Sequence, residues 1–133
     1  PPRSTLFPYT TLFRSDYRIA RMFYRMEDFS AAIQMFNNIL KDFPDSPHKE
    51  ELMFLIVKAG HRFAMESILD KQKERHSKVI AASNDFYSLY PASQFQAEAL
   101  QMKEKSQNQL EALSGSDLYK LDHKSLRIKD KQQ

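Results

Sequence analysis

The sequence predicts an all-α fold, a solenoid of antiparallel helix hairpins with about five helices in one domain. Over most of the 133 residues, apolar side chains recur at the three- and four-residue spacing of one helix face. The chain has only two glycines, Gly60 and Gly115, which are too few for the turns of a hairpin-rich β fold. An aromatic block that ends in proline occurs twice, and its prolines, Pro44 and Pro91, are 47 positions apart, which indicates an internal repeat.

The first hairpin is expected between Asp16 and Pro44. Asp16 is a suitable N-cap for the first helix, and Glu27-Asp28 forms the turn to the second helix. Pro44 ends that helix, because proline lacks the backbone N–H and disfavours helical geometry in the residue before it. The apolar stripes of the two helices are Ile19, Ala20, Phe23 and Met26, and then Phe29, Ala32, Ile33, Phe36, Ile39, Leu40 and Phe43.

A second hairpin is expected to follow. Ser46-Pro47 fits an N-cap with proline at the first helical position, and this helix should continue to Ser67 or slightly beyond. The charged segment 70–76, DKQKERH, is either a solvated helix extension or a loop. The next helix ends before Pro91 and carries Val79, Ile80, Ser83, Phe86, Tyr87 and Tyr90.

A last helix begins at Ser93 and is expected to end near Gly115, capping the solenoid. Its apolar face has Phe95, Ala99, Met102, Ser106, Leu110 and Leu113, and its polar face has Gln96, Lys103 and Gln107. Residues 114–133 are mixed polar and are expected to form a flexible tail, with only a little helix near Leu118–Leu126.

Residues 1–15 are not expected to belong to the native protein. Thr5–Ser15, TLFPYTTLFRS, matches one reading frame of a common sequencing adapter codon for codon over eleven codons. We therefore expect a translated adapter fused to a truncated gene, with the helical domain at 16–113 and the native chain beginning upstream of Asp16. The alternative is a native proline-rich extension.

The first hairpin fits the register of a tetratricopeptide (TPR) unit, in which small residues let the two helices approach and aromatic residues fill the space beside them. Ala20 and Ala32 take the small positions, Phe23 and Phe36 take the aromatic positions, and Pro44 ends the unit. The departures are Glu27, at the position of the turn glycine, and Ile39, at the last small position. The second unit fits poorly and contains 13 extra residues, counted as the 47-residue spacing against the TPR period of about 34.

The order of the motifs resembles a known family. The blocks FYRMEDF, FNNILKDFPDS and MFLIVKA are followed by the charged insert KQKERH and the closing block FYSLYPASQFQAEA. This order resembles the C-terminal half of the BamD (ComL/YfiO) family of outer-membrane assembly lipoproteins, over residues 16–113. The single blocks are generic to TPR proteins, whereas their order with a lengthened second repeat is more specific.

That resemblance implies a protein-binding scaffold and no enzymatic activity. Members of the family are lipid-anchored on the periplasmic side of the outer membrane, in the machinery that folds β-barrel proteins into that membrane. The implied partners are the BamA-like barrel subunit and other components of the machinery, onto which the C-terminal repeats dock. The implied membrane contact is a lipid anchor upstream of this fragment, and neither a cofactor nor a metal is implied.

The candidate partner-binding residues lie on the first helix of each hairpin, which lines the concave face of a TPR solenoid. On the first such helix they are Tyr17, Arg21, Tyr24 and Arg25, of the two residue types most enriched at interface hot spots. On the next they are Lys58, His61 and Arg62, in a polar strip with Glu51. For both strips the alternative is ordinary solvated surface. Charge reversal of Arg21 and of Arg62 is expected to weaken partner binding.

Several function classes are disfavoured. Residues 16–113 carry a net charge of −1 with both signs mixed, which is not a nucleic-acid footprint. The absence of cysteine excludes Cys-ligated zinc. No two of the histidines, His48, His61, His76 and His123, are three or four positions apart, so no zinc site is expected and His61 is expected at the surface.

Two other functions remain as alternatives. One is an unrelated TPR adaptor that clamps a carboxylate with Lys and Asn; here Arg21 takes the matching position and no Asn is nearby, which argues against it. The other is a fragment of a helical enzyme, for which the sequence offers no nucleophile–base pair.

A solenoid cut between repeats should expose apolar surface, because each repeat buries one face on its neighbour. The first hairpin is therefore expected to expose part of Ile19, Met22, Phe23 or Met26. The candidates to cover that surface are Leu6, Phe7, Leu12 and Phe13.

Overall fold

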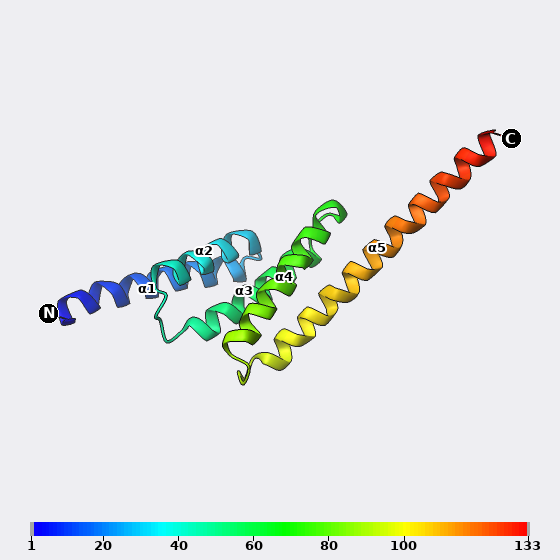
Figure 1. The fold of residues 1–133 in the computed structure, drawn as a ribbon. Helices are drawn as coiled ribbons and strands as arrows, with labels where there is room; N and C mark the ends of the chain where they lie inside the picture. Colours follow the sequence, from blue (N-terminus) through cyan, green and yellow to red (C-terminus); the bar gives the residue numbers. More distant parts are fainter. Residues whose placement is uncertain (1, 133) are drawn as a thin grey trace.

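The computed structural model describes the backbone of residues 2–132 and the side chains of residues 11–115. The described backbone forms five helices and no strand, so the predicted all-α class is confirmed (Figure 1). The helices are α1 (Pro2–Arg25), α2 (Phe29–Asp42), α3 (Lys49–Met65), α4 (Leu69–Leu89) and α5 (Gln96–Gln132).

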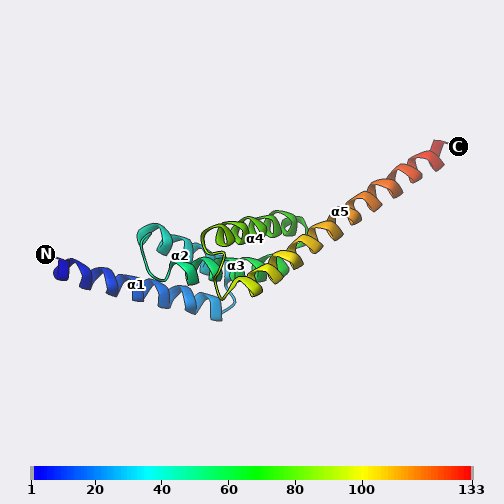
Figure 2. The same cartoon turned by 60° about the horizontal axis from the view of Figure 1, so that its bottom comes forward.

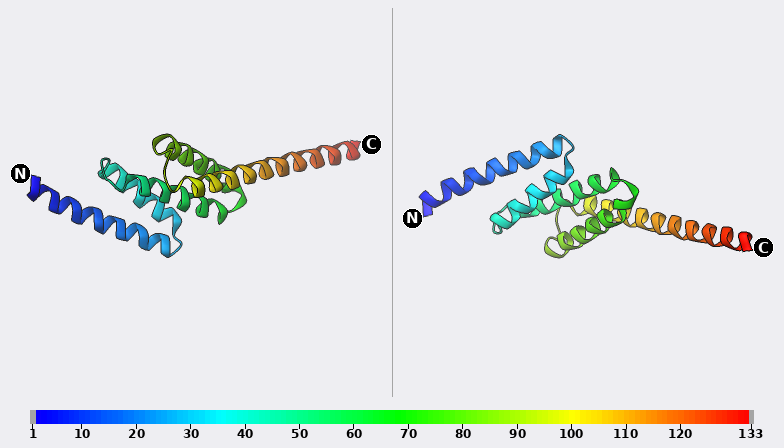
Figure 3. Two further views of the ribbon diagram at one scale, coloured as in Figure 1. Left: turned by 90° about the horizontal axis from the view of Figure 1, so that it is seen from below. Right: turned by 90° about the horizontal axis from the view of Figure 1, so that it is seen from above.

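The helices are arranged as a solenoid. Each helix packs on the next along the chain, and α3 also packs on α5. The hairpin α1–α2 is followed by the hairpin α3–α4 and then by α5 alone (Figure 1). The start of α1 and the second half of α5 extend beyond the packed helices at opposite ends of an elongated molecule (Figure 2, Figure 3). Packing between sequence neighbours is typical of helical repeats, and the architecture is TPR-like.

The turn between α1 and α2 ends one helix and begins the next within three residues. The backbone N–H of Asp28 donates to the carbonyl of Phe23, and that of Glu27 donates to the carbonyl of Tyr24, both at 3.0 Å, which is a Schellman motif. Glu27 has a φ of 61°, the left-handed conformation that glycine adopts most readily. The Asp28 carboxylate accepts a hydrogen bond from the backbone N–H of Ala31 at 3.2 Å and caps α2.

The connections after α2 and after α4 have the same geometry. The C-cap residues Phe43 and Tyr90 have φ/ψ of −129°/62° and −133°/61°. The hydroxyls of Ser46 and Ser93 each accept a hydrogen bond at 3.1 Å from the backbone N–H two residues later. The 47-residue repeat is therefore present in the backbone. However, α3 begins later than the N-cap predicted at Ser46, and α5 begins later than the helix start predicted at Ser93.

The core consists of two adjoining clusters that follow most of the predicted stripes. The two small TPR positions, Ala20 and Ala32, are fully buried. The cluster of α1, α2 and α3 contains Ala20, Ala32, Phe36, Ile39, Phe43, Leu52 and Leu55. The cluster of α3, α4 and α5 contains Phe54, Val57, Ala64, Val79, Phe86 and Ala99. Tyr87 departs from its stripe and is 53% exposed.

The outer face of α1 is open, as predicted. Ile19, Met22 and Met26 are exposed to 38%, 42% and 67%, whereas Phe23 packs against the first core cluster. Leu12 is itself exposed and does not cover this face. Leu6 and Phe7 lie outside the described side chains.

The helix start predicted at Asp16 is wrong, because α1 begins at Pro2 and continues through Asp16. Proline is compatible with the first turn of a helix. Farther along, Phe13 packs against the core, with its ring centroid 5.5 Å from that of Phe43 and 5.1 Å from that of His48. These long-range aromatic contacts stabilise the turn of α1 that precedes Asp16.

The helix end predicted near Gly115 is also wrong. α5 continues to Gln132, and the backbone of 116–132 is helical rather than only the short stretch near 118–126. A single glycine costs a helix about 1 kcal/mol and does not stop it, and the sequence has no proline after Pro91.

Two polar side chains, those of His76 and Gln96, are buried although the sequence did not predict it. The charged segment 70–76 is helical, within α4, and its last residue, His76, is fully buried. Gln96, predicted on a polar face, is 7% exposed, so that prediction is wrong. Its side-chain amide donates to the carbonyl of Tyr90 at 2.8 Å, which satisfies a carbonyl at the end of α4.

Candidate protein-binding surface

A hollow of about 640 Å³ lies between α1 and the start of α3. We call it the arginine hollow, because four of its lining residues are arginines of α1. Its lining residues are Phe13, Arg14, Tyr17, Arg18, Arg21, Arg25, His48 and Glu51. The arginines occur at intervals of four, three and four residues, the spacing that keeps side chains on one helix face.

Tyr17 forms part of the wall of the hollow and joins α1 to α3. Its hydroxyl donates a hydrogen bond to Oε1 of Glu51 at 3.0 Å. Its ring stacks on Phe13, with centroids 6.0 Å apart and an interplanar angle of 7°. Burial raises the pKa of Tyr17, as do the hydrogen bond to Glu51 and the negative charge of Glu51, while Arg21 lowers it. Tyr17 is therefore a neutral donor at physiological pH.

The four arginines give the hollow an uncompensated positive charge. Among the side chains of residues 11–115, none of their guanidinium groups forms an ion pair. Glu51 is the one acidic residue of the lining, and its carboxylate accepts the hydrogen bond of Tyr17. Arg21 lies over the ring of Tyr24, 5.9 Å from its centroid, a weak contact at an accessible site. The guanidinium groups are free to bind an anionic partner.

The predicted strip of the first helix is only partly brought together. Tyr17, Arg21 and Arg25 line the hollow. Tyr24 does not, because its ring packs edge-on against Phe29 with centroids 5.4 Å apart. Arg14, Arg18, Phe13 and His48 were not predicted as site residues; for the arginines, the regular spacing along the helix was an available signal.

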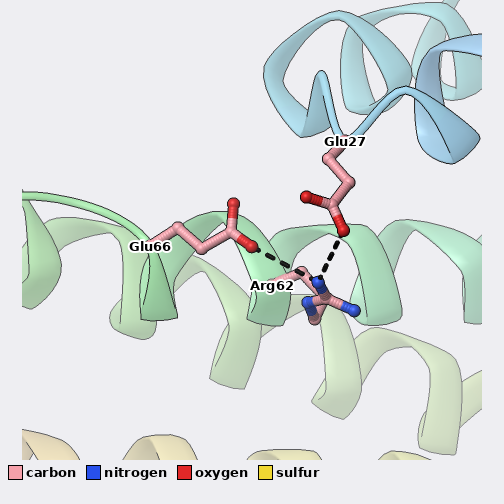
Figure 4. A network of polar contacts seen from close by, with 3 residues as sticks. All are labelled: Glu27, Arg62 and Glu66. Carbon is pink, nitrogen blue, oxygen red and sulfur yellow. Dashed lines mark hydrogen bonds and ion pairs between the residues drawn. The ribbon is translucent and has the colours of Figure 1, made fainter.

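The cations of the strip on α3 are engaged within the chain. Arg62 contacts carboxylate oxygens of Glu27 at 3.4 Å and Glu66 at 3.3 Å (Figure 4). Its guanidinium also lies over the ring of Phe29, 5.0 Å from the centroid. Lys58 pairs with Glu98 of α5 at 3.6 Å. These exposed pairs contribute little stability, but they occupy both cations with neighbouring helices and turns.

His61, predicted at the surface, is partly exposed, and its ring is turned toward α4. Its ring faces that of His76, with centroids 6.4 Å apart, and its Nε2 is buried without a hydrogen-bond partner. His76 Nδ1 lies 2.9 Å from Oγ of Ser106. Burial lowers the pKa of both histidines, and for His61 the pKa is lowered further by repulsion from His76 when that ring is also protonated, and from Lys105 and Arg62. Both rings are therefore neutral near pH 7.

Two other kinds of site are absent from the described residues. No group of three or more His, Cys, Asp or Glu side chains is arranged to hold a metal ion there. In that same part of the chain, no helix is both long and apolar enough to cross a membrane.

No protein-family model matches the chain, and no curated protein matches it either. The class of the protein is therefore defined by its fold, a TPR-like helical repeat, and by the arginine hollow on its first helix.

Proposed function

We propose that this chain is a protein-binding scaffold subunit of the machinery that assembles β-barrel proteins in the outer membrane. In this proposal it docks onto the periplasmic part of the BamA-like barrel subunit. The observation that carries the proposal is the arginine hollow, an accessible surface on which, among the side chains of residues 16–115, the guanidinium groups of Arg18, Arg21 and Arg25 form no ion pair and lie beside Tyr17, whose hydroxyl is held by Glu51. The assignment to this particular machinery rests on the resemblance of residues 16–113 to the BamD family.

The chemistry of the hollow suits binding. Arginine and tyrosine bring a large contact area and directed hydrogen bonds, and they dominate interface hot spots. Because Tyr17 is already held by Glu51 at 3.0 Å, a partner would meet a wall that needs little further ordering, which reduces the entropic cost of association.

The proposal also includes a location. The full-length protein would be lipid-anchored on the periplasmic side of the outer membrane, through a segment upstream of residue 16. That part of the proposal is tested by sequencing the genomic locus upstream of Asp16, where a signal peptide that ends in a lipobox cysteine is expected.

Calorimetric titration tests the docking. The purified chain is titrated with the periplasmic domains of the barrel subunit encoded in the same genome. Binding is expected, and Arg21→Glu is expected to weaken it more than Arg62→Glu, because Arg62 is held by Glu27 and Glu66. Lys78→Glu, on α4, is the matched control and should leave binding unchanged. If the parent chain does not bind, or the Lys78 variant is weakened as much as the Arg21 variant, the proposal is wrong.

A further inference from the structure

We propose that a groove between α2 and α4, the second helices of the two hairpins, binds an amphipathic helix of a partner protein that is acidic at one end. The groove shares no lining residue with the arginine hollow. The inference therefore goes beyond the proposed function and does not depend on it.

The groove is a hollow of about 690 Å³ whose walls are α2 and α4 and whose floor is α3. Both walls pack on α3. Its apolar lining includes the partly buried side chains of Ile33, Ile56 and Phe63. The α4 wall extends from Lys71 to Asp85, which is about 21 Å or four helical turns. A groove of this length and lining suits an amphipathic helix, which docks through apolar side chains on one face.

Gly60 lies in the floor of the groove, in the second half of α3. Glycine weakens a helix interior relative to alanine, and the φ of Gly60 is not positive. A β-carbon at this position would meet only Cγ2 of Val79, at an ordinary contact distance of 3.5 Å. Packing within the described chain therefore does not require glycine here, whereas the bare backbone lets the axis of a docked helix approach closely.

The charges of the groove give it two different ends. Lys71 and Arg75 lie near the start of α4 and Asp85 lies near its end. Among the side chains of residues 11–115, neither Lys71 nor Asp85 forms an ion pair. Arg75 lies over the ring of Phe63, 4.0 Å from its centroid, and donates a hydrogen bond to Oγ of Ser67 at 2.6 Å. A helix whose acidic end lies over Lys71 and Arg75 is complementary to this pattern.

The rest of the lining favours a helix over an extended peptide or an anionic membrane. The other two charged residues, Glu74 and Lys78, pair with each other at 3.3 Å, so the groove is not a broad cationic surface for lipid headgroups. Its walls are helices whose backbone hydrogen bonds are internal, so they offer no backbone pairing to an extended segment. A helix satisfies its own backbone groups and brings only side chains to the groove.

The test uses the whole chain and a fluorescein-labelled, alanine-based peptide of about four helical turns. The peptide carries leucines three and four positions apart on one face, two glutamates in its first turn and a lysine in its last turn, charges that also favour the helix. Fluorescence anisotropy is expected to show saturable binding. The same peptide with its leucines spread around the helix should bind at least about tenfold more weakly, and glutamine in place of glutamate should weaken binding about threefold.

Two variants of the chain test the floor and the charged end separately. Gly60→Leu fills the floor and should weaken peptide binding at least about tenfold. Its matched control is Gly115→Leu, which places the same side chain where nothing lies within 4 Å of the added β-carbon and should leave affinity unchanged. Lys71→Glu should weaken binding about three- to tenfold, whereas Lys41→Glu, at an exposed position of α2 outside the lining, should not.

Far-UV circular dichroism and urea midpoints establish which variants remain folded, and the Lys71 variant decides the matter if Gly60→Leu does not fold. The inference is overturned if the parent chain does not bind the amphipathic peptide, or if a folded Gly60 or Lys71 variant binds it as tightly as the parent does. It is also overturned if a control loses as much affinity as its matched variant, or if vesicles of anionic phospholipid displace the peptide completely. Its failure is distinguishable from failure of the proposed function, because the titration with the barrel subunit responds to Arg21 and this one to Gly60 and Lys71.

Discussion

Glu27→Gly tests the left-handed turn that joins α1 to α2. A residue with a side chain in this conformation costs about 1–2 kcal/mol relative to glycine, and Glu27 has a φ of 61°. Glycine also makes the unfolded chain more flexible, which lowers the free energy of unfolding by about 0.4–1 kcal/mol and offsets part of the relieved strain. The substitution also removes the ion pair with Arg62, whose side chains are 65% and 46% exposed, which is worth about 0.3 kcal/mol.

The expected result is a variant about 0.5 kcal/mol more stable than the parent. Glu27→Ala is the matched control, since it also loses the ion pair but keeps a β-carbon in the left-handed conformation. It should be about 0.3 kcal/mol less stable than the parent, and thus about 0.8 kcal/mol below the glycine variant.

Urea unfolding followed by far-UV circular dichroism measures both free energies of unfolding. Equal stability of the glycine and alanine variants would refute the argument, because it would mean that the left-handed strain is no larger than the roughly 0.4–1 kcal/mol that glycine loses to the freedom of the unfolded chain. A glycine variant less stable than the parent would mean that the ion pair of Figure 4 outweighs the strain.

Three further predictions concern the helices and the hollow. Burial lowers the pKa of His61 and His76 in the folded chain; the free energy of unfolding should therefore be highest above the unfolded-state pKa of about 6.5 and fall as the pH drops below it, because the unfolded chain then binds more protons. Urea unfolding at a series of pH values should show a smaller fall for His61→Gln, and an equal fall would contradict the assignment. Gly115→Ala should strengthen α5 locally by about 0.5–1 kcal/mol, since nothing lies within 4 Å of its added β-carbon; hydrogen exchange of the neighbouring amides should slow, and unchanged exchange would count against a continuous helix. Tyr17→Phe removes the hydrogen bond to Glu51 and should lower the free energy of unfolding by about 1 kcal/mol; an unchanged urea midpoint would show that this bond does not hold α1 to α3.

The helices that end in proline were predictable because their signals are local. Pro44 and Pro91 stop α2 and α4 within two residues, and the same backbone geometry precedes both. Small residues such as Ala20 and Ala32 are buried where the TPR register predicted them. Local sequence signals and the short repeat were therefore enough to predict most of the fold.

The parts that were missed depend on contacts between residues distant in the sequence. The turn of α1 that precedes Asp16 is held by the packing of Phe13 against Phe43 and His48, which no local pattern reveals. His76 lies in a charged segment, yet it is buried against Ser106 of α5. It is also 47 positions after Phe29, a buried residue of α2. The repeat therefore indicated a buried position here, although the charged residues around His76 suggested an exposed one.

The candidate site was half predictable for a similar reason. Helix geometry places Tyr17, Arg21 and Arg25 on one face, and all three line the hollow. His48 and Glu51 join them only because α3 returns beside α1, a tertiary arrangement that the sequence of one helix does not contain.

Site-specific photo-cross-linking in the source cell tests the central claim most directly, namely that the α1 surface is where this scaffold meets its partner. A photoreactive amino acid is introduced in place of Arg21, in the hollow, and in a second strain in place of Lys78, on α4. The account predicts a cross-link to the barrel subunit of the outer-membrane assembly machinery from position 21 and none from position 78. A cross-link to that subunit from position 78 alone, or its absence from both positions, would contradict the account.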